Sequence, residues 1–227
     1  MRNQYSVSII FPIAFIIFCS IAVTSYATDL SVGGGISYTP ITSKLSVNDW
    51  GWEGSTSDHF NFATFSVFID VAYVQAAVAY GMRVSGSYDS EGSFSGSGVY
   101  TNKETYLGLI VLLKYPFELA NFVLFPLVGL ESDLNLTYRD ESGSDLKSIL
   151  TLDEKDHLNM YFIKFGAGAD ISISRRTYLR PVVVLGYKLR SRLDKDVVDY
   201  YKTTYNLTDV TLNTWKWEIT VLAGYRL

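Results

Sequence analysis

Cysteine and histidine are almost missing from this sequence of 227 residues. It contains one cysteine, Cys19, and two histidines, His59 and His157. A single cysteine forms no disulfide within the chain, so a core, a hydrogen-bond ladder or a membrane must stabilise the fold. The sequence also lacks a phosphate loop, a dinucleotide fingerprint and a cysteine nucleophile. These absences exclude the enzyme classes that depend on such motifs.

The amino-terminal segment has the pattern of a secretory signal. Arg2 precedes an apolar stretch over residues 7–23, and small residues flank Tyr26 at the cleavage position. We therefore expect a cleaved signal peptide over residues 1–27 and one domain over residues 28–227. A retained membrane anchor is the first alternative, although Pro12 interrupts a stretch shorter than the ~20 residues of a spanning helix. Lipidation at Cys19 is the second alternative, but Phe18 is larger than the small residue expected before that cysteine.

The mature chain carries an excess of acid. Cleavage removes Arg2 and no acidic residue, which leaves 18 basic and 23 acidic residues and a net charge of −5. This balance argues against nucleic acid as a partner.

Strand-like alternation is the dominant pattern of the mature chain. Eight runs are expected, over residues 30–41, 62–71, 73–85, 104–115, 122–136, 159–171, 177–190 and 214–227. They suit the ~9–11 residues that a tilted strand needs to cross a bilayer. Long connections, over residues 42–61, 86–103, 138–157 and 191–213, alternate with tight links near 71–73, 116–121 and 172–176. Outer-membrane barrels place short turns in the periplasm and long loops outside, so both termini are expected to be periplasmic.

Charged residues and glycines select the same inward face. On residues 177–190, Leu179, Val183 and Leu185 oppose Arg180 and Lys188, and lysine or arginine turned toward lipid would cost about 2–4 kcal/mol near the midplane. Nine glycines fall on the inward side, where missing Cβ atoms relieve crowding: Gly33, Gly35, Gly81, Gly108, Gly129, Gly166, Gly168, Gly186 and Gly224. We therefore predict an all-β fold, a closed antiparallel transmembrane barrel of about eight strands.

Several short segments are similar to the small opacity and OmpX-type outer-membrane barrels. They are Asp70 with Tyr73-Val74-Gln75, Lys114-Tyr115-Pro116-Phe117, Phe125-Pro126-Leu127, Tyr178-Leu179-Arg180-Pro181 and Gly224-Tyr225-Arg226-Leu227. The resemblance covers the mature chain and implies a bacterial outer-membrane location, a lipid environment and recognition by the outer-membrane assembly machinery. We expect a monomer.

The inward ionisable residues form the candidate lumen network. They are Asp70, Arg83, Glu131, Asp133, Lys164, Asp170, Arg180, Lys188, Arg190, Lys216, Glu218 and Arg226. One interpretation is a plug of charges that pair with one another, because unpaired buried charge is costly. The other is a narrow path for solutes. We favour the plug, because a barrel of about eight strands is filled by side chains.

Catalytic and metal chemistry have little support. Barrel enzymes that modify lipopolysaccharide use a histidine with a serine and an acid, but His59 and His157 read as solvated loop residues. The acidic group of Asp153, Glu154 and Asp156 matches no calcium loop, and Asp194, Asp196 and Asp199 are interpreted as part of a soluble rim. We expect no enzyme, no cofactor and no metal.

The long loops are the remaining candidates for function. Trp50 and Trp52 lie in an otherwise polar loop, and Tyr200, Tyr201 and Tyr205 cluster in the last one. Exposed aromatics often anchor partners, although these could instead fold onto the rim. The sequence therefore predicts a non-enzymatic surface protein whose loops contact an unknown partner or mediate adhesion. A narrow porin is the alternative, followed by a soluble secreted lipid-binding barrel with its apolar face inward and by a lipopolysaccharide-modifying enzyme.

Overall fold

A computed structural model describes residues 30–49, 52–93, 95–119, 122–151, 155, 158–189 and 192–227. The expected signal peptide, Trp50, the side chain of Trp52, His157 and Arg190 lie outside the described parts of the chain. None of the helices in these parts is long and apolar enough to cross a membrane.

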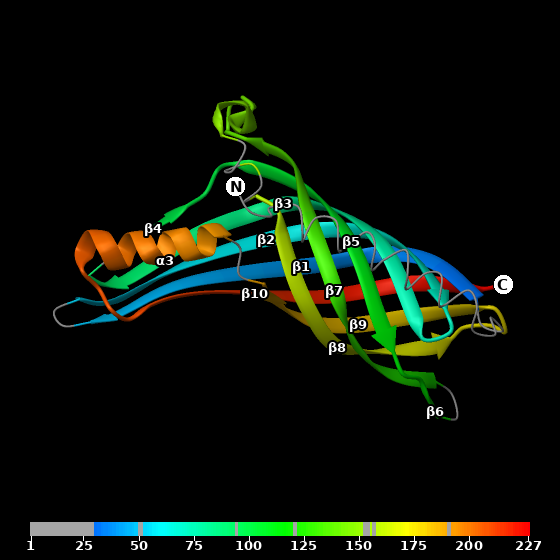
Figure 1. The fold of residues 1–227 in the computed structure, drawn as a ribbon. Coiled ribbons are helices and arrows are strands. Elements are labelled where there is room, and N and C mark those ends of the chain that lie inside the picture. Colours follow the sequence, from blue (N-terminus) through cyan, green and yellow to red (C-terminus); the bar gives the residue numbers. More distant parts are fainter. Residues whose placement is uncertain are drawn as a thin grey trace, which may run out of the picture.

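Eight antiparallel strands form a ring (Figure 1). They are β1 (Leu30–Asp49), β2 (Trp52–Val71), β3 (Val74–Gly92), β5 (Lys103–Lys114), β7 (Phe122–Arg139), β8 (Met160–Ser172), β9 (Thr177–Lys188) and β10 (Val210–Arg226). Each pairs with two neighbours, and the β2–β3 pairing returns the ladder to its start. The short strands β4 (Gly96–Val99) and β6 (Phe117–Leu119) pair with β3 and β7, outside the ring. The predicted all-β barrel of about eight strands is confirmed.

The two faces of the strands differ as the alternation predicts. Outward positions on every strand of the ring carry apolar residues, and Phe65, Val67, Ile69 and Val183 are 57, 49, 44 and 50% exposed. Arg180, on the opposite face, is 1% exposed. The alternative of a soluble barrel with these apolar residues inside is therefore wrong. The apolar residues that such a barrel would turn inward form its outer surface instead, and contact of that surface with water would be unfavourable.

Aromatic side chains gather at both margins of the apolar outer surface. At the end that holds the short turns, the ring of Tyr115 lies 6.2 Å from that of Tyr73 and 5.2 Å from that of Phe117. At the other end, the ring of Tyr187 lies 4.7 Å from that of Trp215. Such amphipathic rings are characteristic of the two interfaces of a bilayer.

Two long connections were predicted incorrectly, because strand pairing continues through them. Residues 42–61 lie almost entirely within β1 and β2, which pair from Leu30↔Val71 to Asp49↔Trp52. Residues 86–103 include the end of β3 and the hairpin to β4. The described residues of these segments are mostly polar, so they lack the regular alternation that marks the membrane-facing parts. Their serines and threonines nevertheless support extended backbone.

The last long connection contains a helix, α3 (Arg192–Tyr205), where only a loop was expected. Asp194 in its first turn and Lys202 in its last turn complement the helix dipole. Asn206 ends the helix with φ of +54°, and the N–H of Leu207 donates to the carbonyl of Lys202. Val198 and Tyr201 pack against a small buried cluster with Val47 of β1 and Val210 of β10.

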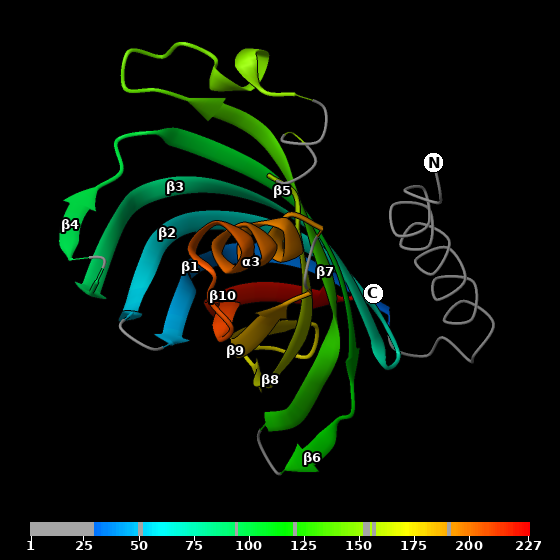
Figure 2. The same ribbon diagram turned by 60° about the vertical axis from the view of Figure 1, so that its left-hand side comes forward.

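The strands are unequal in length, so the ends of β1, β2 and β3 project beyond the rest of the rim. We call these projecting ends the raised wall. β1 and β2 have 20 residues each, whereas β8 has 13 and β9 has 12. Figure 2 shows β1, β2 and β3 curving beyond the short strands, with α3 lying in their concavity. The Asp49 carboxylate accepts hydrogen bonds from the backbone N–H and the hydroxyl of Thr208, which attach the end of the helical connection to the tip of β1.

Candidate functional site

The inward side chains form two charged groups separated by an apolar layer. We call Asp70, Lys114, Asp170 and Arg180 the short-turn cluster, and Glu131, Asp133, Lys164, Lys216 and Glu218 the central cluster. On β9, Val182 and Val184 lie between Arg180 and Gly186, and Gly186 pairs with both Lys164 and Lys216. These valines belong to a buried apolar group, which consists of Phe68, Ala77, Ala79, Ile110, Leu112, Phe125, Leu127, Tyr178, Val182, Val184 and Leu222. We call the part of this group around Val182 and Val184, between the two clusters, the apolar layer.

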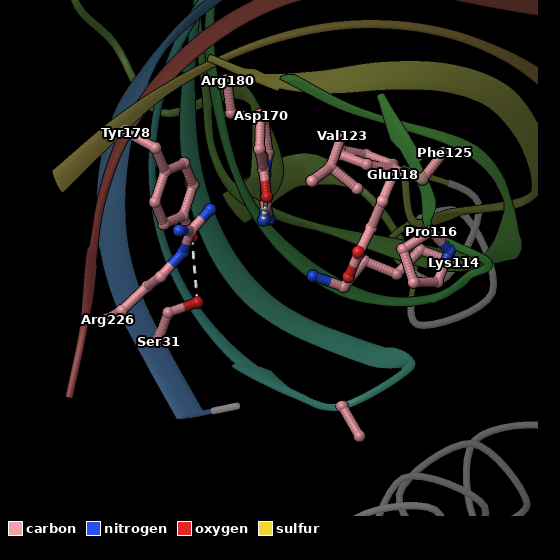
Figure 3. A pocket seen from close by; sticks show the side chains of 11 residues that line it. Ser31, Lys114, Pro116, Glu118, Val123, Phe125, Asp170, Tyr178, Arg180 and Arg226 are labelled. Atoms are coloured by element: carbon pink, nitrogen blue, oxygen red, sulfur yellow. Dashed lines mark hydrogen bonds and ion pairs between the residues drawn. The ribbon is translucent and has the colours of Figure 1, made fainter. Parts of the chain in front are cut away.

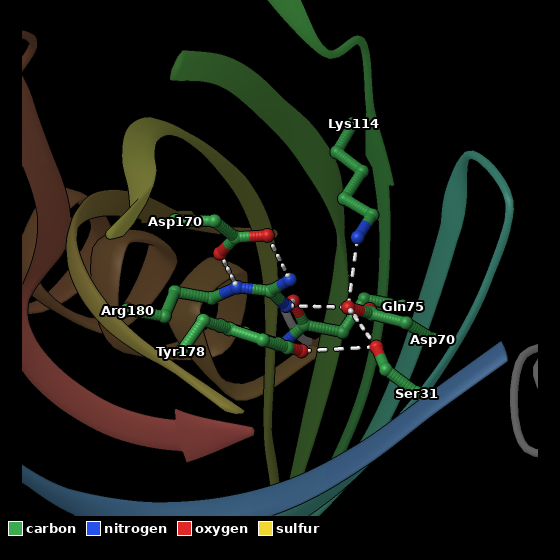
Figure 4. A network of polar contacts seen from close by, with 7 residues as sticks. All are labelled: Ser31, Asp70, Gln75, Lys114, Asp170, Tyr178 and Arg180. Carbon is green, nitrogen blue, oxygen red and sulfur yellow. Dashed lines mark hydrogen bonds and ion pairs between the residues drawn. The ribbon is translucent and has the colours of Figure 1, made fainter. Parts of the chain in front are cut away.

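Arg180 organises the short-turn cluster (Figure 4). Its Nε and Nη2 donate to the two carboxylate oxygens of Asp170 at 2.6 and 2.9 Å, a bidentate pair. Its Nη1 lies 2.6 Å from Oδ2 of Asp70 and donates to Oε1 of Gln75 at 2.9 Å. The Lys114 ammonium also donates to Oδ2 of Asp70, at 2.7 Å. Two cations therefore face two carboxylates, and the cluster is balanced in charge.

Aromatic rings surround the Arg180 guanidinium. Its central carbon lies 5.0 Å from the ring centroids of Phe68 and Phe125 and 4.9 Å from that of Tyr178. These cation–π contacts add to the ion pairs where water is excluded. Glycines make room for such rings. A Cβ atom at Gly224 would overlap the ring of Tyr178, and one at Gly81 would overlap the ring of Tyr106.

The central cluster has three carboxylates and two ammonium groups. The Lys164 ammonium lies 2.6 Å from Glu218 and 3.1 Å from Glu131, and the Lys216 ammonium lies 2.7 Å from Asp133 and 3.0 Å from Glu131. The side chains of both lysines, Glu131 and Asp133 are 1% exposed. Four ion pairs join these groups within the barrel, but the carboxylates outnumber the ammonium groups, and Oδ1 of Asp133 has no hydrogen-bond partner.

Two further ion pairs lie nearer the end with the long connections. Arg83 lies 3.3 Å from Glu104, and its guanidinium donates to the carbonyl of Asn102. Lys188 donates to Asp194 of α3 at 2.9 Å, so it pairs at the rim and not within the central lumen. The guanidinium of Arg226 lies 5.3 Å from the ring centroid of Tyr178.

Lys114, Glu104 and Asp194 belong to these pairs but were not identified in the sequence. Lys114 shares the face of Ile110 and Leu112 on β5, a run that is apolar on both sides and therefore marks no face clearly. Only the parity with Gly108 could have identified it. Asp194 was assigned to a soluble rim, because the helix that directs it toward Lys188 was not expected.

A hollow of about 240 Å³ opens beside the short-turn cluster (Figure 3). Lys114, Asp170, Arg180 and Arg226 line it from four strands. On the other side of this cluster, the cavity beside Gln75 and Lys164 has a volume of only about 20 Å³, roughly the space of one water molecule. The hollow therefore ends at the charged cluster and the apolar layer.

The other sequence candidates are not brought together into a reactive site. His59 is exposed, and its Nδ1 lies 3.2 Å from the hydroxyl of Thr42. Tyr200, Tyr201 and Tyr205 form a cluster on α3, with ring centroids 5.7 to 6.3 Å apart. No group of three His, Cys, Asp or Glu residues within the described ranges could hold a metal ion. Asp153, Glu154 and Asp156 lie outside those ranges.

Comparisons with known proteins found similar chains among solved structures alone. No protein-family model matches the chain, and no curated protein matches it. Among solved structures, neisserial surface protein A is 14% identical with a TM-score of 0.40, and the match covers 86% of this chain and 97% of that protein. Ail, the attachment invasion locus protein of Yersinia pestis, in complex with the heparin analogue sucrose octasulfate, is 13% identical with a TM-score of 0.33, covering 88% and 99%.

The outer membrane protease OmpT from Escherichia coli is also similar, at 7% identity and a TM-score of 0.35, with 89% of this chain and 98% of the protease covered. At these identities the likeness concerns the strand arrangement and not an activity. The ring of eight strands and its apolar outer surface are the architecture that the resemblance to small outer-membrane barrels implies.

Proposed function

We propose that this protein is a non-conducting barrel of the bacterial outer membrane that presents its raised wall and α3 as a contact surface. The length of the strands carries this proposal. β1 and β2 have 20 residues each, about twice the ~9–11 residues that a tilted strand needs to cross a bilayer. The excess residues are mostly polar and are paired as a sheet, so they form a rigid structure beyond the membrane.

The outer surface of the barrel supports insertion into lipid. The outward positions on β10 carry Trp215, Trp217, Ile219 and Val221, and each of these is exposed. An apolar surface of this kind is stable when acyl chains cover it. The short-turn end and both termini would then face the periplasm, and the outer-membrane assembly machinery would insert the chain.

The filled lumen supports a role other than transport. The short-turn cluster is balanced in charge, the apolar layer follows it, and the cavity beyond holds about one water. A hydrated ion that crossed this layer would lose its water without gaining ligands from protein. We therefore favour a contact protein over a narrow porin.

Single-channel recording tests this choice. The mature chain is refolded in detergent, its folding is verified by heat-modifiable mobility on a gel, and it is inserted into a planar bilayer. We expect a folded and silent barrel. As a matched positive control, Leu112→Gly combined with Val184→Gly thins the apolar layer without changing a charge and should produce steps in current. Reproducible steps from the unmodified chain would favour the porin and overturn the proposal.

The contact role requires a second measurement. Cells that display the full chain are compared with cells that display a variant whose residues 44–57 are replaced by a two-residue turn, because the ring below that hairpin keeps its pairing. We expect the full chain to increase attachment to immobilised host glycoprotein and the shortened chain to lose that increase. Equal attachment at equal surface amounts would contradict the proposed role of the raised wall.

The proposal does not include an enzyme. Proteolysis is the alternative to test, because a protease is among the similar structures. A peptide library incubated with the folded barrel provides the test. We expect no cleavage above the level of the His59→Ala variant. Cleavage that depends on His59 would replace the contact role with hydrolysis.

A further inference from the structure

A larger hollow lies where the pairing between β3 and β5 stops. That ladder ends at Met82↔Thr105, and β3 next pairs with β4, beginning at Ser87↔Val99. Between these points the chain leaves a hollow of about 480 Å³. It is lined by residues 83–85 of β3, by residues 100–103 and by Glu141. This volume lies within the range of pockets that bind small molecules.

The wall of this hollow is fixed by side chains in place of the missing ladder. The Nε of Arg83 donates to the Asn102 carbonyl at 3.0 Å, and the Arg83 guanidinium also pairs with Glu104. The Asn102 amide donates to the hydroxyl of Tyr138 at 2.9 Å. These bonds join β3 to the segment before β5 and to β7, so the hollow has a defined shape without a bound molecule.

One aromatic ring in the lining is held on several sides. The N–H of Tyr100 donates to the carbonyl of Gly86 at 2.9 Å, and its hydroxyl donates to Asp58 at 2.7 Å. Its ring centroid lies 5.2 Å from that of Phe60 and 5.6 Å from that of Tyr88. Burial and the Asp58 carboxylate raise the pKa of Tyr100, so the hydroxyl remains a donor at neutral pH. A ring that is already fixed loses little entropy when a ligand stacks on it.

The polar groups of the lining show no preference for charge. Lys103 and Glu141 bring one charge of each sign, and neither has an ion-pair partner within the parts of the chain that are described. Arg83 is neutralised by Glu104. A sulfated or phosphorylated ligand would need an excess of cations, which this hollow does not offer.

We propose that the hollow binds a neutral hexose unit of a glycan, with the C–H face of the sugar on the ring of Tyr100 and its hydroxyls bonded to Asn102, Lys103 and Glu141. A sugar ring has one apolar face and a rim of hydroxyls. The apolar face matches the fixed ring of Tyr100, and the hydroxyls match the hydrogen-bond donors and acceptors of a lining whose charges balance. This inference rests on the proposed contact role and names the chemical class of its partner.

Saturation-transfer NMR on the refolded mature chain in detergent micelles tests the inference. The probes are lactose, N-acetyllactosamine and maltose, with sucrose octasulfate as the anionic comparison. We expect at least one neutral saccharide to bind saturably and to compete with the others. A neutral hexose oligosaccharide with the sequence of the outer core of lipopolysaccharide, without Kdo or phosphate, is a further probe. Binding to it alone would identify the glycan as one from the bacterial surface, whereas binding to lactose or N-acetyllactosamine would identify a host-type glycan.

Matched variants locate the site. Tyr100→Ala should weaken saccharide binding roughly tenfold, because it removes the stacking surface. Tyr100→Phe keeps the ring and should remain within about threefold of the unmodified chain. Tyr73→Ala removes an exposed tyrosine at the short-turn end, away from the hollow, and should have no effect on saccharide binding. All variants must show the heat-modifiable mobility of the folded barrel.

The inference is overturned if no neutral saccharide binds to the folded chain, if Tyr100→Ala binds as well as the unmodified chain, or if only sucrose octasulfate binds. Its failure is distinguishable from failure of the proposed function. A silent barrel with wall-dependent attachment but without saccharide binding would discard the sugar site alone, whereas a conducting barrel would discard the contact role.

Discussion

Replacing Arg180 with methionine should destabilise the folded barrel by about 3–5 kcal/mol, the cost of breaking a buried ion pair from one side. Arg180 is 1% exposed and makes two bonds to Asp170, one contact with Asp70 and one hydrogen bond to Gln75. After the substitution Asp70 retains Lys114, but Asp170 loses its bidentate partner in the cluster. The uncompensated charge of Asp170 therefore accounts for most of the loss.

The double variant Arg180→Met with Asp170→Asn separates charge from packing. It removes the stranded carboxylate, so we expect it to recover about 1–3 kcal/mol of the loss. Urea unfolding of the refolded chain in lipid vesicles, followed by tryptophan fluorescence and by gel mobility, measures both variants. A single variant as stable as the unmodified chain, or a double variant no more stable than the single one, would refute the reasoning that these charges hold one another in the lumen.

Three other substitutions test the faces and ends of the elements. Val183→Arg places a charge on the lipid-facing surface at a cost of about 2–4 kcal/mol and should prevent stable membrane assembly, whereas Lys188→Gln should not. The fraction of each variant that is folded and bound to vesicles is measured, and normal assembly of Val183→Arg would show that the face is misassigned. Gly81→Val should prevent folding in detergent because the valine side chain would overlap the ring of Tyr106, and adding Tyr106→Ala should restore folding. A well-folded Gly81→Val variant would contradict the crowding of the lumen. Asn206→Val should destabilise the end of α3 by about 1–2 kcal/mol because the φ angle of Asn206 is +54°, while Asn206→Gly should be neutral or stabilising. Hydrogen exchange of the α3 amides measures both variants, and equal protection of these amides in the two variants would contradict the argument.

The membrane-facing part of the barrel could be predicted from the sequence because lipid imposes a rule on every second residue. Val183 and Lys164 follow that rule, and their exposures, on opposite faces, agree with it. The rule ends where the membrane ends. Residues 42–61 continue to pair as strands, but outside the lipid their residues are mostly polar, and their hydrophobicity does not distinguish a strand from a loop.

The charged clusters could be predicted only in part, because parity identifies a face and not a partner. The expected inward residues of the two clusters lie in the lumen. The pairing of Arg180 with both Asp70 and Asp170, however, depends on the relative positions of β2, β8 and β9 along the barrel axis. The hollow between β3 and β5 could not be predicted at all. Phe60, Tyr88 and Tyr100 come from separate segments, and only the register of β2, β3 and β4 brings their rings together.

The unequal heights of the strands also determine how a large object could reach this surface. β8 and β9 have 13 and 12 residues and form a low part of the rim within the described chain, whereas β1 and β2, with 20 residues each, stand high on the opposite side. A bulky partner would therefore approach obliquely, over the low side, and its distance from the lipid would be set by the low rim. Neighbouring molecules on a crowded cell surface would obstruct that approach from one direction only, so the rotational orientation of each barrel in the membrane would decide whether it can engage.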